Sequence, residues 1–226
     1  MYTVLRCIVK NGRPSPASGS QARFVRLVLR SWFFFLVPFS FSPATHAQPL
    51  PQSTLDTVRT YRSLERALAE PMQVYRLDLS KQKLKAVPEE LRRLPNLNAL
   101  DLGRNKLKDL PGWMNELRYM QEFSAGRNKL TAVPNSICQW KNLKRLDLHQ
   151  NEIEGLSACM GNLKELFSLD LWSNDLGDFP DEISGMKALR FMDLRVIQFS
   201  QGEMDRISSL LPSVKIYFSQ PCNCGE

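Results

Sequence analysis

The chain has 226 residues, 43% of them hydrophobic, and a formal net charge of +7. This hydrophobic share suffices for a packed core and excludes wholesale disorder. Six of the 30 basic residues and none of the 23 acidic ones lie in residues 1–47, which leaves 24 against 23, or about +1, in residues 48–226. Because phosphate-backbone binding needs a strongly basic surface, we expect no nucleic-acid partner.

Residues 1–47 resemble an export signal. Arg23, Arg26 and Arg30 precede an apolar run over residues 32–41, and Thr45-His46-Ala47 offers small residues before a cleavage point at Gln48. The run is about ten residues long, whereas a membrane-spanning helix needs about 20. We therefore predict a signal peptide, a secreted or periplasmic location, and no stable membrane insertion after cleavage. The alternative is a membrane anchor formed by an uncleaved leader.

The next segment, residues 48–73, has the pattern of a helix. Apolar residues recur in it at helical spacing (Leu55, Val58, Tyr61, Leu64 and Leu68). Ser53 or Thr54 can serve as the N-cap, and Pro71 ends the segment. The pattern predicts one helix over residues 54–70.

A 23-residue period then runs through residues 74–199, with six units that start at Val74, Leu97, Met120, Leu143, Leu166 and Leu189. In the first five units, all 35 residues at positions 1, 4, 6, 11, 14, 18 and 21 are apolar, and the sixth unit is degenerate. A strict period of this kind indicates stacked units that share one core.

Two further positions of the repeat are nearly constant. Position 9 is Asn in the four middle units (Asn105, Asn128, Asn151 and Asn174), and position 15 is Pro in four units, with Ser157 as the exception. A buried Asn can bond backbone groups of its own and the adjacent coil, which predicts a structural asparagine ladder. Proline helps to turn the chain.

The unit LxxLxLxxNxLxxLPxxIxxLxxL resembles the 23-residue typical leucine-rich repeat of Ras-suppressor-type proteins, here in a bacterial-type exported chain. The resemblance implies an α/β solenoid, a right-handed curved coil whose parallel strands line a concave face. Because the ends of such a stack expose apolar edges, we expect a capping helix at each end. At the C-terminal end, residues 200–226, Ser200 and Glu203 have capping-box spacing before a helix, and Val214, Ile216 and Phe218 alternate as in a last strand.

Catalytic and metal-binding patterns are weak. His149 is the only histidine after the leader, and no serine or cysteine nucleophile is obviously paired with it. The cysteine and histidine spacing fits no zinc pattern, so we predict no enzyme, cofactor or metal. Four cysteines follow the leader (Cys138, Cys159, Cys222 and Cys224). Cys138 and Cys159 occupy neighbouring coils, where a bridge or two partly buried thiols are alternatives.

The predicted concave face carries the residue types that are enriched at binding hot spots. Position 7 gives His149, Trp172 and Arg195 on successive coils, and position 3 adds Phe191. Basic residues extend this surface (Arg145, and at position 8 Lys81, Arg104 and Arg127), beside a row of aspartates at position 5. The alternative is that Trp172 and Phe191 pack against each other and only shield the end of the stack.

These patterns favour a non-catalytic module that binds a protein partner on its concave face. Fold analogy supplies part of this prediction. The alternative function is a structural or self-assembling component of the cell envelope that binds glycan or its own copies.

Overall fold

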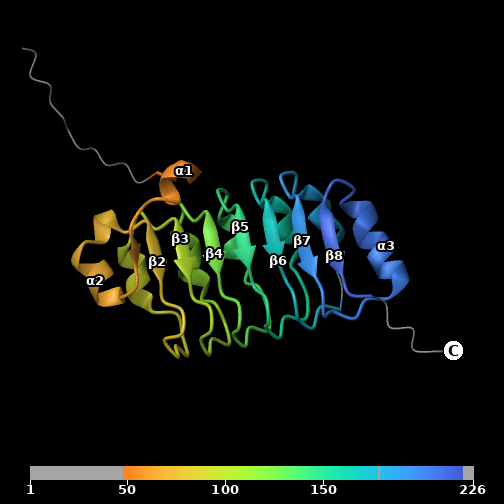
Figure 1. The fold of residues 1–226 in the computed structure, drawn as a ribbon, viewed down its shortest axis with the longest axis horizontal. Coiled ribbons are helices and arrows are strands. Elements are labelled where there is room, and N and C mark those ends of the chain that lie inside the picture. The colour runs from red at the N-terminus through yellow and green to blue at the C-terminus, as the bar shows by residue number, and fades with distance from the viewer. Residues whose placement is uncertain (1–47, 178, 221–226) are drawn as a thin grey trace, which may run out of the picture. The chain divides into compact units, whose positions relative to one another are not determined.

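Each repeat contributes one short strand to a single parallel sheet in the computed structural model, which describes residues 48–177 and 179–220. The predicted leader, Cys222 and Cys224 lie outside the described residues. In this part of the chain the sheet has eight strands in sequence order. They are β1 (Thr60–Tyr61), β2 (Arg76–Asp78), β3 (Ala99–Asp101), β4 (Glu122–Ser124), β5 (Arg145–Asp147), β6 (Ser168–Asp170), β7 (Phe191–Leu194) and β8 (Lys215–Phe218). Figure 1 shows them side by side.

The register of the sheet follows the 23-residue period. Leu77 pairs with Leu100, Leu100 with Phe123, and Phe123 with Leu146. Leu146 then pairs with Leu169. The predicted stack with one shared interior is therefore confirmed.

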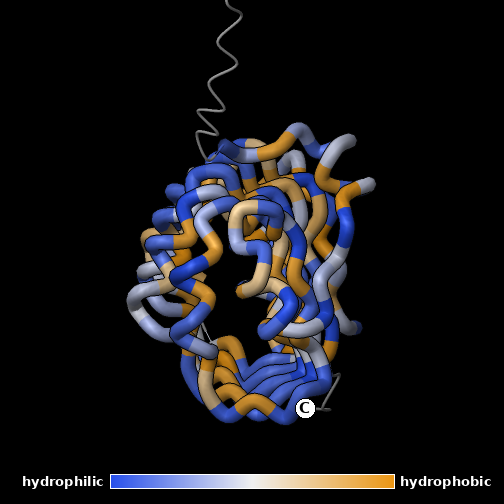
Figure 2. The backbone as a smooth tube through the Cα atoms, turned by 90° about the vertical axis from the view of Figure 1, so that its left-hand side faces the viewer, coloured by the Kyte–Doolittle hydropathy of each residue, from blue (hydrophilic) through white to orange (hydrophobic). Residues whose placement is uncertain are grey.

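The core is built from the seven apolar positions of the repeat. All 35 of these residues in the first five units are buried except Leu84 and Leu156, which are partly buried against the core. In Figure 2, seen along the stack, successive coils superpose, which is why each buried side chain is covered by its counterparts in the adjacent coils.

The return segments opposite the sheet are short 3-10 helices: η2 (Glu89–Arg93), η3 (Gly112–Glu116), η4 (Ile137–Gln139), η5 (Ala158–Asn162) and η6 (Asp181–Gly185). Pro88, Pro111 and Pro180 stand at the N-caps of three of them. Ser157, the exception to the proline pattern, caps η5 by accepting a hydrogen bond from the Cys159 amide.

The disulfide alternative is the one that the structure contains. Cys138 in η4 and Cys159 in η5 are bonded, with their Cα atoms 5.7 Å apart. The bond joins the third and fourth coils on the side of the molecule away from the strands.

The single helix predicted over residues 54–70 is wrong. The segment forms α1 (Gln52–Leu55), β1, α2 (Leu64–Ala69) and then η1 (Pro71–Gln73). Tyr61, predicted to lie on a helix face, is 4% exposed and pairs with Leu77 as a strand residue. The physical reason is that β2 would otherwise leave a row of unpaired backbone groups at the sheet edge, which a helix cannot pair and a strand can.

At the C-terminal end, α3 (Gln201–Leu210) begins with the predicted capping box of Ser200 and Glu203. Met204 and Ile207 of this helix join the core, and β8 pairs with β7. Within the described residues, no helix is long and apolar enough to cross a membrane.

Candidate functional site

The sheet presents an outward side, formed by repeat positions 3, 5 and 7, which we call the sheet face. Positions 4 and 6 point into the core, so the residues between them must point outward. Two adjoining hollows lie on this face, of about 420 and 320 Å³, and both are lined by Asp101, Ser124 and Asp147. The first also includes Arg145, and the second includes Arg104, Arg127 and His149.

The aspartates at position 5 hold the backbone where each strand ends. In five repeats the carboxylate accepts a hydrogen bond from the amide two residues further on, at 2.7–3.2 Å (Asp78, Asp101, Asp147, Asp170 and Asp193). Each aspartate therefore fixes the backbone at position 7, just beyond the strand.

The aspartates of this row differ in whether a positive side chain offsets their charge. Burial raises the pKa of Asp101, and the carboxylates of Asp78 and Asp147 raise it further. Burial also raises the pKa of Asp170, helped by the neighbouring charges of Asp147 and Asp193. Asp193 differs: burial alone would raise its pKa, but hydrogen bonds from Arg195 hold it below the usual value.

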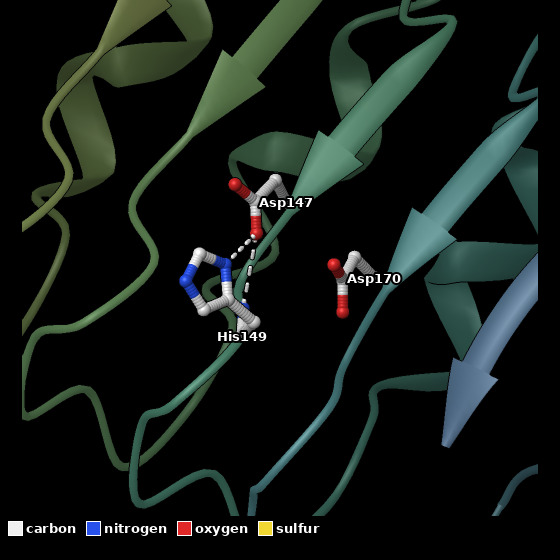
Figure 3. Close-up of side chains that lie close together, drawn as sticks. All are labelled: Asp147, His149 and Asp170. Atoms are coloured by element: carbon white, nitrogen blue, oxygen red, sulfur yellow. Dashed lines mark hydrogen bonds and ion pairs between the residues drawn. The ribbon is translucent and has the colours of Figure 1, made fainter. Parts of the chain in front are cut away.

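Figure 3 shows His149 beside Asp147, with Asp170 on the adjacent coil. Nδ1 of His149 is 2.5 Å from Oδ1 of Asp147, and donor atoms of Asp147, His149 and Asp170 all lie within 4.8 Å of one another. These donor types suit a divalent metal ion. However, Asp147 already accepts hydrogen bonds from Ser124 and from the His149 amide, and Asp170 accepts one from the Trp172 amide. Hydrogen bonds from the protein thus already occupy carboxylate oxygens that a metal ion would need as ligands.

The aromatic residues predicted as parts of one binding surface belong to two separate pairs. Trp172, half-buried, stacks on His149 with ring centroids 5.8 Å apart and an interplanar angle of 29°. Phe191 instead meets Phe167, at 5.3 Å and 66°. No ring contact joins Trp172 to Phe191 among the described residues, so the alternative, that these two rings pack against each other, does not describe their contacts.

The predicted arginines differ in their partners. Arg195 binds both oxygens of Asp193 and lies 5.8 Å from the Tyr217 ring centroid. Arg145 pairs with Glu122, which also binds Arg76 at 2.9 Å. Glu122 was missed in the sequence because position 3 varies from repeat to repeat.

Position 8, which carries Arg104 and Arg127, adopts a left-handed backbone in all six repeats, with φ between 52° and 63° (Lys81, Arg104, Arg127, Gln150, Ser173 and Val196). In this geometry the amides of Arg104 and Arg127 bond carbonyl groups of the next coil, at 2.8 and 2.7 Å. The backbone, rather than a side-chain partner, therefore places these two exposed arginines at the rim of the sheet face.

The asparagines at position 9 complete this turn. The amide group of Asn151 donates to the carbonyl oxygens of Ala125 and Leu148, and its oxygen accepts from the Leu130 amide. Asn105, Asn128 and Asn174 repeat the pattern one coil apart. These bonds link neighbouring coils beneath the candidate site.

Comparison with known proteins gives a consistent result. The family model described as leucine rich repeat matches residues 118–176. No curated protein matches the chain.

Among solved structures, a leucine-rich-repeat protein of Leptospira interrogans is 30% identical, with a TM-score of 0.61 over 72% of this chain and 47% of that one. An internalin of Listeria monocytogenes is 23% identical (TM-score 0.52, 65% of this chain and 40% of that one). The ectodomain of the Arabidopsis thaliana membrane receptor kinase GASSHO1/SCHENGEN3, in complex with CASPARIAN STRIP INTEGRITY FACTOR 2, is 24% identical (TM-score 0.58, 71% and 20%).

The chain spans less than half the length of each of these three proteins. Over the parts compared, their folds are similar to that of this chain. With its 23-residue period, the parallel sheet of its described residues and these similarities, the chain carries leucine-rich repeats.

Proposed function

We propose that this chain is a non-catalytic, exported protein-binding module whose sheet face contacts a macromolecular partner. The observation that carries the proposal is the pair of adjoining hollows on that face, with exposed Arg104 and Arg127 at the rim and the His149–Trp172 stack beyond. Aromatic rings and arginines are the side chains that most often dominate binding energy. A receptor ectodomain of similar fold was solved in complex with CASPARIAN STRIP INTEGRITY FACTOR 2, which supports a binding role for this chain.

The geometry around His149 supports the absence of catalysis. A serine nucleophile would have to donate its hydrogen bond to the imidazole. Ser124 donates to Asp147 instead, at 2.9 Å, and among residues 48–177 and 179–220 no hydroxyl or thiol is bonded to the His149 ring. Within the described residues, His149 therefore lacks the order of contacts that acyl transfer requires.

The disulfide supports export. Bonds such as Cys138–Cys159 form and persist in oxidising compartments and are rare in the cytosol. Together with the signal-like segment at residues 1–47, this favours a secreted or periplasmic location.

The test is affinity capture with the full chain and two matched variants. We expect Trp172→Ala to abolish recovery of the partner and Trp113→Ala, which removes a tryptophan from η3 on the opposite side, to retain it. Circular dichroism would verify that both variants are folded. Equal recovery by the wild type and Trp172→Ala would overturn the proposal. A mass that rises with concentration in light scattering, and falls in Trp172→Ala, would favour self-assembly instead.

A further inference from the structure

A second surface lies where the strands begin, at the segments 118–121, 141–144, 164–167 and 187–190 and at Lys215, which we call the strand-start edge. Backbone bonds of 2.8–2.9 Å join its successive coils: Lys144 to Gln121, Phe167 to Lys144, Arg190 to Phe167, and Lys215 to Arg190. Because each bond spans one coil, these five residues form a continuous row along the edge.

Two phenyl rings stand exposed in this row. Phe167 is 44% exposed and Phe191 is 42% exposed, and the two rings contact each other edge to face. Phe167 lies between Lys144 on one coil and Arg190 on the next, while Phe191 pairs with Lys215 of β8. The pair is thus an apolar patch with a cation on each side.

The edge is rich in cations without acidic partners. Its four segments and Lys215 carry one acid, Glu165, and seven basic residues: Arg118, Lys141, Lys144, Lys164, Lys187, Arg190 and Lys215. None of these cations pairs with a carboxylate among the described residues, in contrast to Arg92, Arg145 and Arg195. The ammonium group of Lys164, for example, bonds only the carbonyls of Gly161 and Gly185.

A hollow of about 820 Å³ opens beside this row. Its lining includes three cations from successive coils, Arg118, Lys141 and Lys164, and one acid, Glu165. Positive side chains that converge on one concave region attract an anionic ligand.

The same edge already holds a polypeptide further toward the N-terminus. The Leu50 amide donates to Oδ1 of Asn98 at 2.8 Å, and Nε2 of Gln121 donates to the Leu50 carbonyl at 2.7 Å. Figure 1 shows α1, which follows Leu50, at the ends where β2 and β3 begin. Lys144, the next residue in the row, bonds the side-chain oxygen of Gln121 at 2.8 Å.

We propose that the strand-start edge of the fourth to sixth repeats binds an acidic polypeptide segment, with an apolar side chain of that segment packed against Phe167 and Phe191. At its N-terminal end this edge carries side-chain amides that bond the chain's own backbone at Leu50. Further on, it carries Lys144, Phe167 and Arg190, an order that matches a partner with carboxylates on both sides of an apolar residue. Phe191 stands at position 3 and Lys215 pairs with it, so both border the sheet face as well, but the other residues of this surface lie outside that face, and the proposal does not depend on the sheet-face function.

The test is selection of random dodecapeptides displayed on phage against the full chain. The expected products carry several Asp or Glu residues around a Leu, Phe or Trp. A synthetic peptide of the selected sequence should lose affinity by about tenfold with Phe167→Ala and with Arg190→Ala. The matched control Arg127→Ala, on the opposite rim, should change it less than about twofold. Trp172→Ala should also leave it unchanged, which separates this result from the fate of the sheet-face proposal.

Selected peptides without acidic residues, no selection at all, or equal binding by Phe167→Ala would overturn the proposal. A lipid surface is the competing anionic partner. If the full chain sediments with phosphatidylglycerol vesicles, and Phe167→Ala prevents this, the edge binds lipid and the peptide proposal fails.

Discussion

Gly126 lies against the imidazole of His149 on the neighbouring coil, so closely that a β-carbon on Gly126 would overlap the ring. The ring is also hydrogen-bonded to Asp147 and stacked on Trp172. A glycine one coil away is therefore a condition for the orientation of the only histidine in the described part of the chain.

We accordingly expect Gly126→Ala to displace the imidazole and to lower the free energy of unfolding by about 1–2 kcal/mol. The His149 ring signals in NMR should shift, because the bond to Asp147 and the stacking on Trp172 change together. Gly112→Ala is the control, since a β-carbon there meets nothing within 4 Å. Identical His149 signals in wild type and Gly126→Ala would contradict the described packing.

The asparagine ladder gives a second prediction. Asn151→Ala leaves a buried amide and two buried carbonyl groups without their partner, and should lower the free energy of unfolding by about 3 kcal/mol. Urea denaturation measures this loss. Asn162 is exposed and is not one of the position 9 asparagines, so Asn162→Ala should cost less than about 0.5 kcal/mol. Losses of similar size in the two variants would argue against a structural role for Asn151.

Val196 gives a prediction of the opposite sign. It is β-branched, 59% exposed, and has a φ of 63°, a region that L-residues with branched side chains avoid. We expect Val196→Asn to raise the free energy of unfolding by about 1 kcal/mol, because asparagine tolerates this backbone. Val196→Thr keeps the branching and should bring no gain. A gain from threonine equal to that from asparagine would assign the effect to polarity instead of backbone strain.

The aspartate row predicts a dependence on pH. A raised pKa means that folded Asp101 binds its proton more tightly than the unfolded chain does, so its ionisation opposes folding above the raised pKa. Asp101→Asn should therefore raise the Tm at pH 7, and the gain should vanish as the pH falls below the ordinary aspartate value of about 4.

Asp193 is the matched control for this experiment, because its pKa is lowered by Arg195. Its stabilising contribution is present above the unfolded pKa and is lost as the pH falls through the lower folded pKa. Asp193→Asn should thus lower the Tm at pH 7. Thermal melts from pH 3 to 8 test both variants, and the same sign for the two at pH 7 would refute the assignment.

The disulfide predicts sensitivity to reducing agents. Replacing Cys138 and Cys159 together by serine should lower the free energy of unfolding by about 3 kcal/mol, the value typical of a closed loop of this length. A reductant should bring the wild type to the same stability and leave the double variant unchanged. If the wild type is insensitive to the reductant, the bond contributes nothing to stability.

The strands and the core could be predicted from the sequence because each buried position recurs in five consecutive units. Leu100 and its counterparts Leu77 and Leu146 are buried in the same kind of environment. The regular spacing of such apolar residues therefore predicts their burial directly.

Other features had no such signal. The left-handed backbone at position 8 carries lysine, arginine, glutamine, serine and valine and no glycine, so composition did not reveal it. The segment before the repeats has helical periodicity, yet the open edge of β2 requires a strand from it. In the candidate site, the period placed Trp172, which follows β6, and Phe191, in β7, on neighbouring coils. It could not tell that their rings turn toward His149 and Phe167, because outward-facing contacts depend on rotamers and on residues that vary between repeats.

The constant register of the sheet has a consequence for how such a molecule can change. Every strand from β2 to β6 is displaced from its neighbour by the same number of residues, and the asparagine bonds reach only one coil away. A copied or deleted middle coil would restore the same interior contacts on both sides of the junction. Mutation can therefore lengthen or shorten the outward surfaces in whole steps, while the residues that terminate the stack stay as they are.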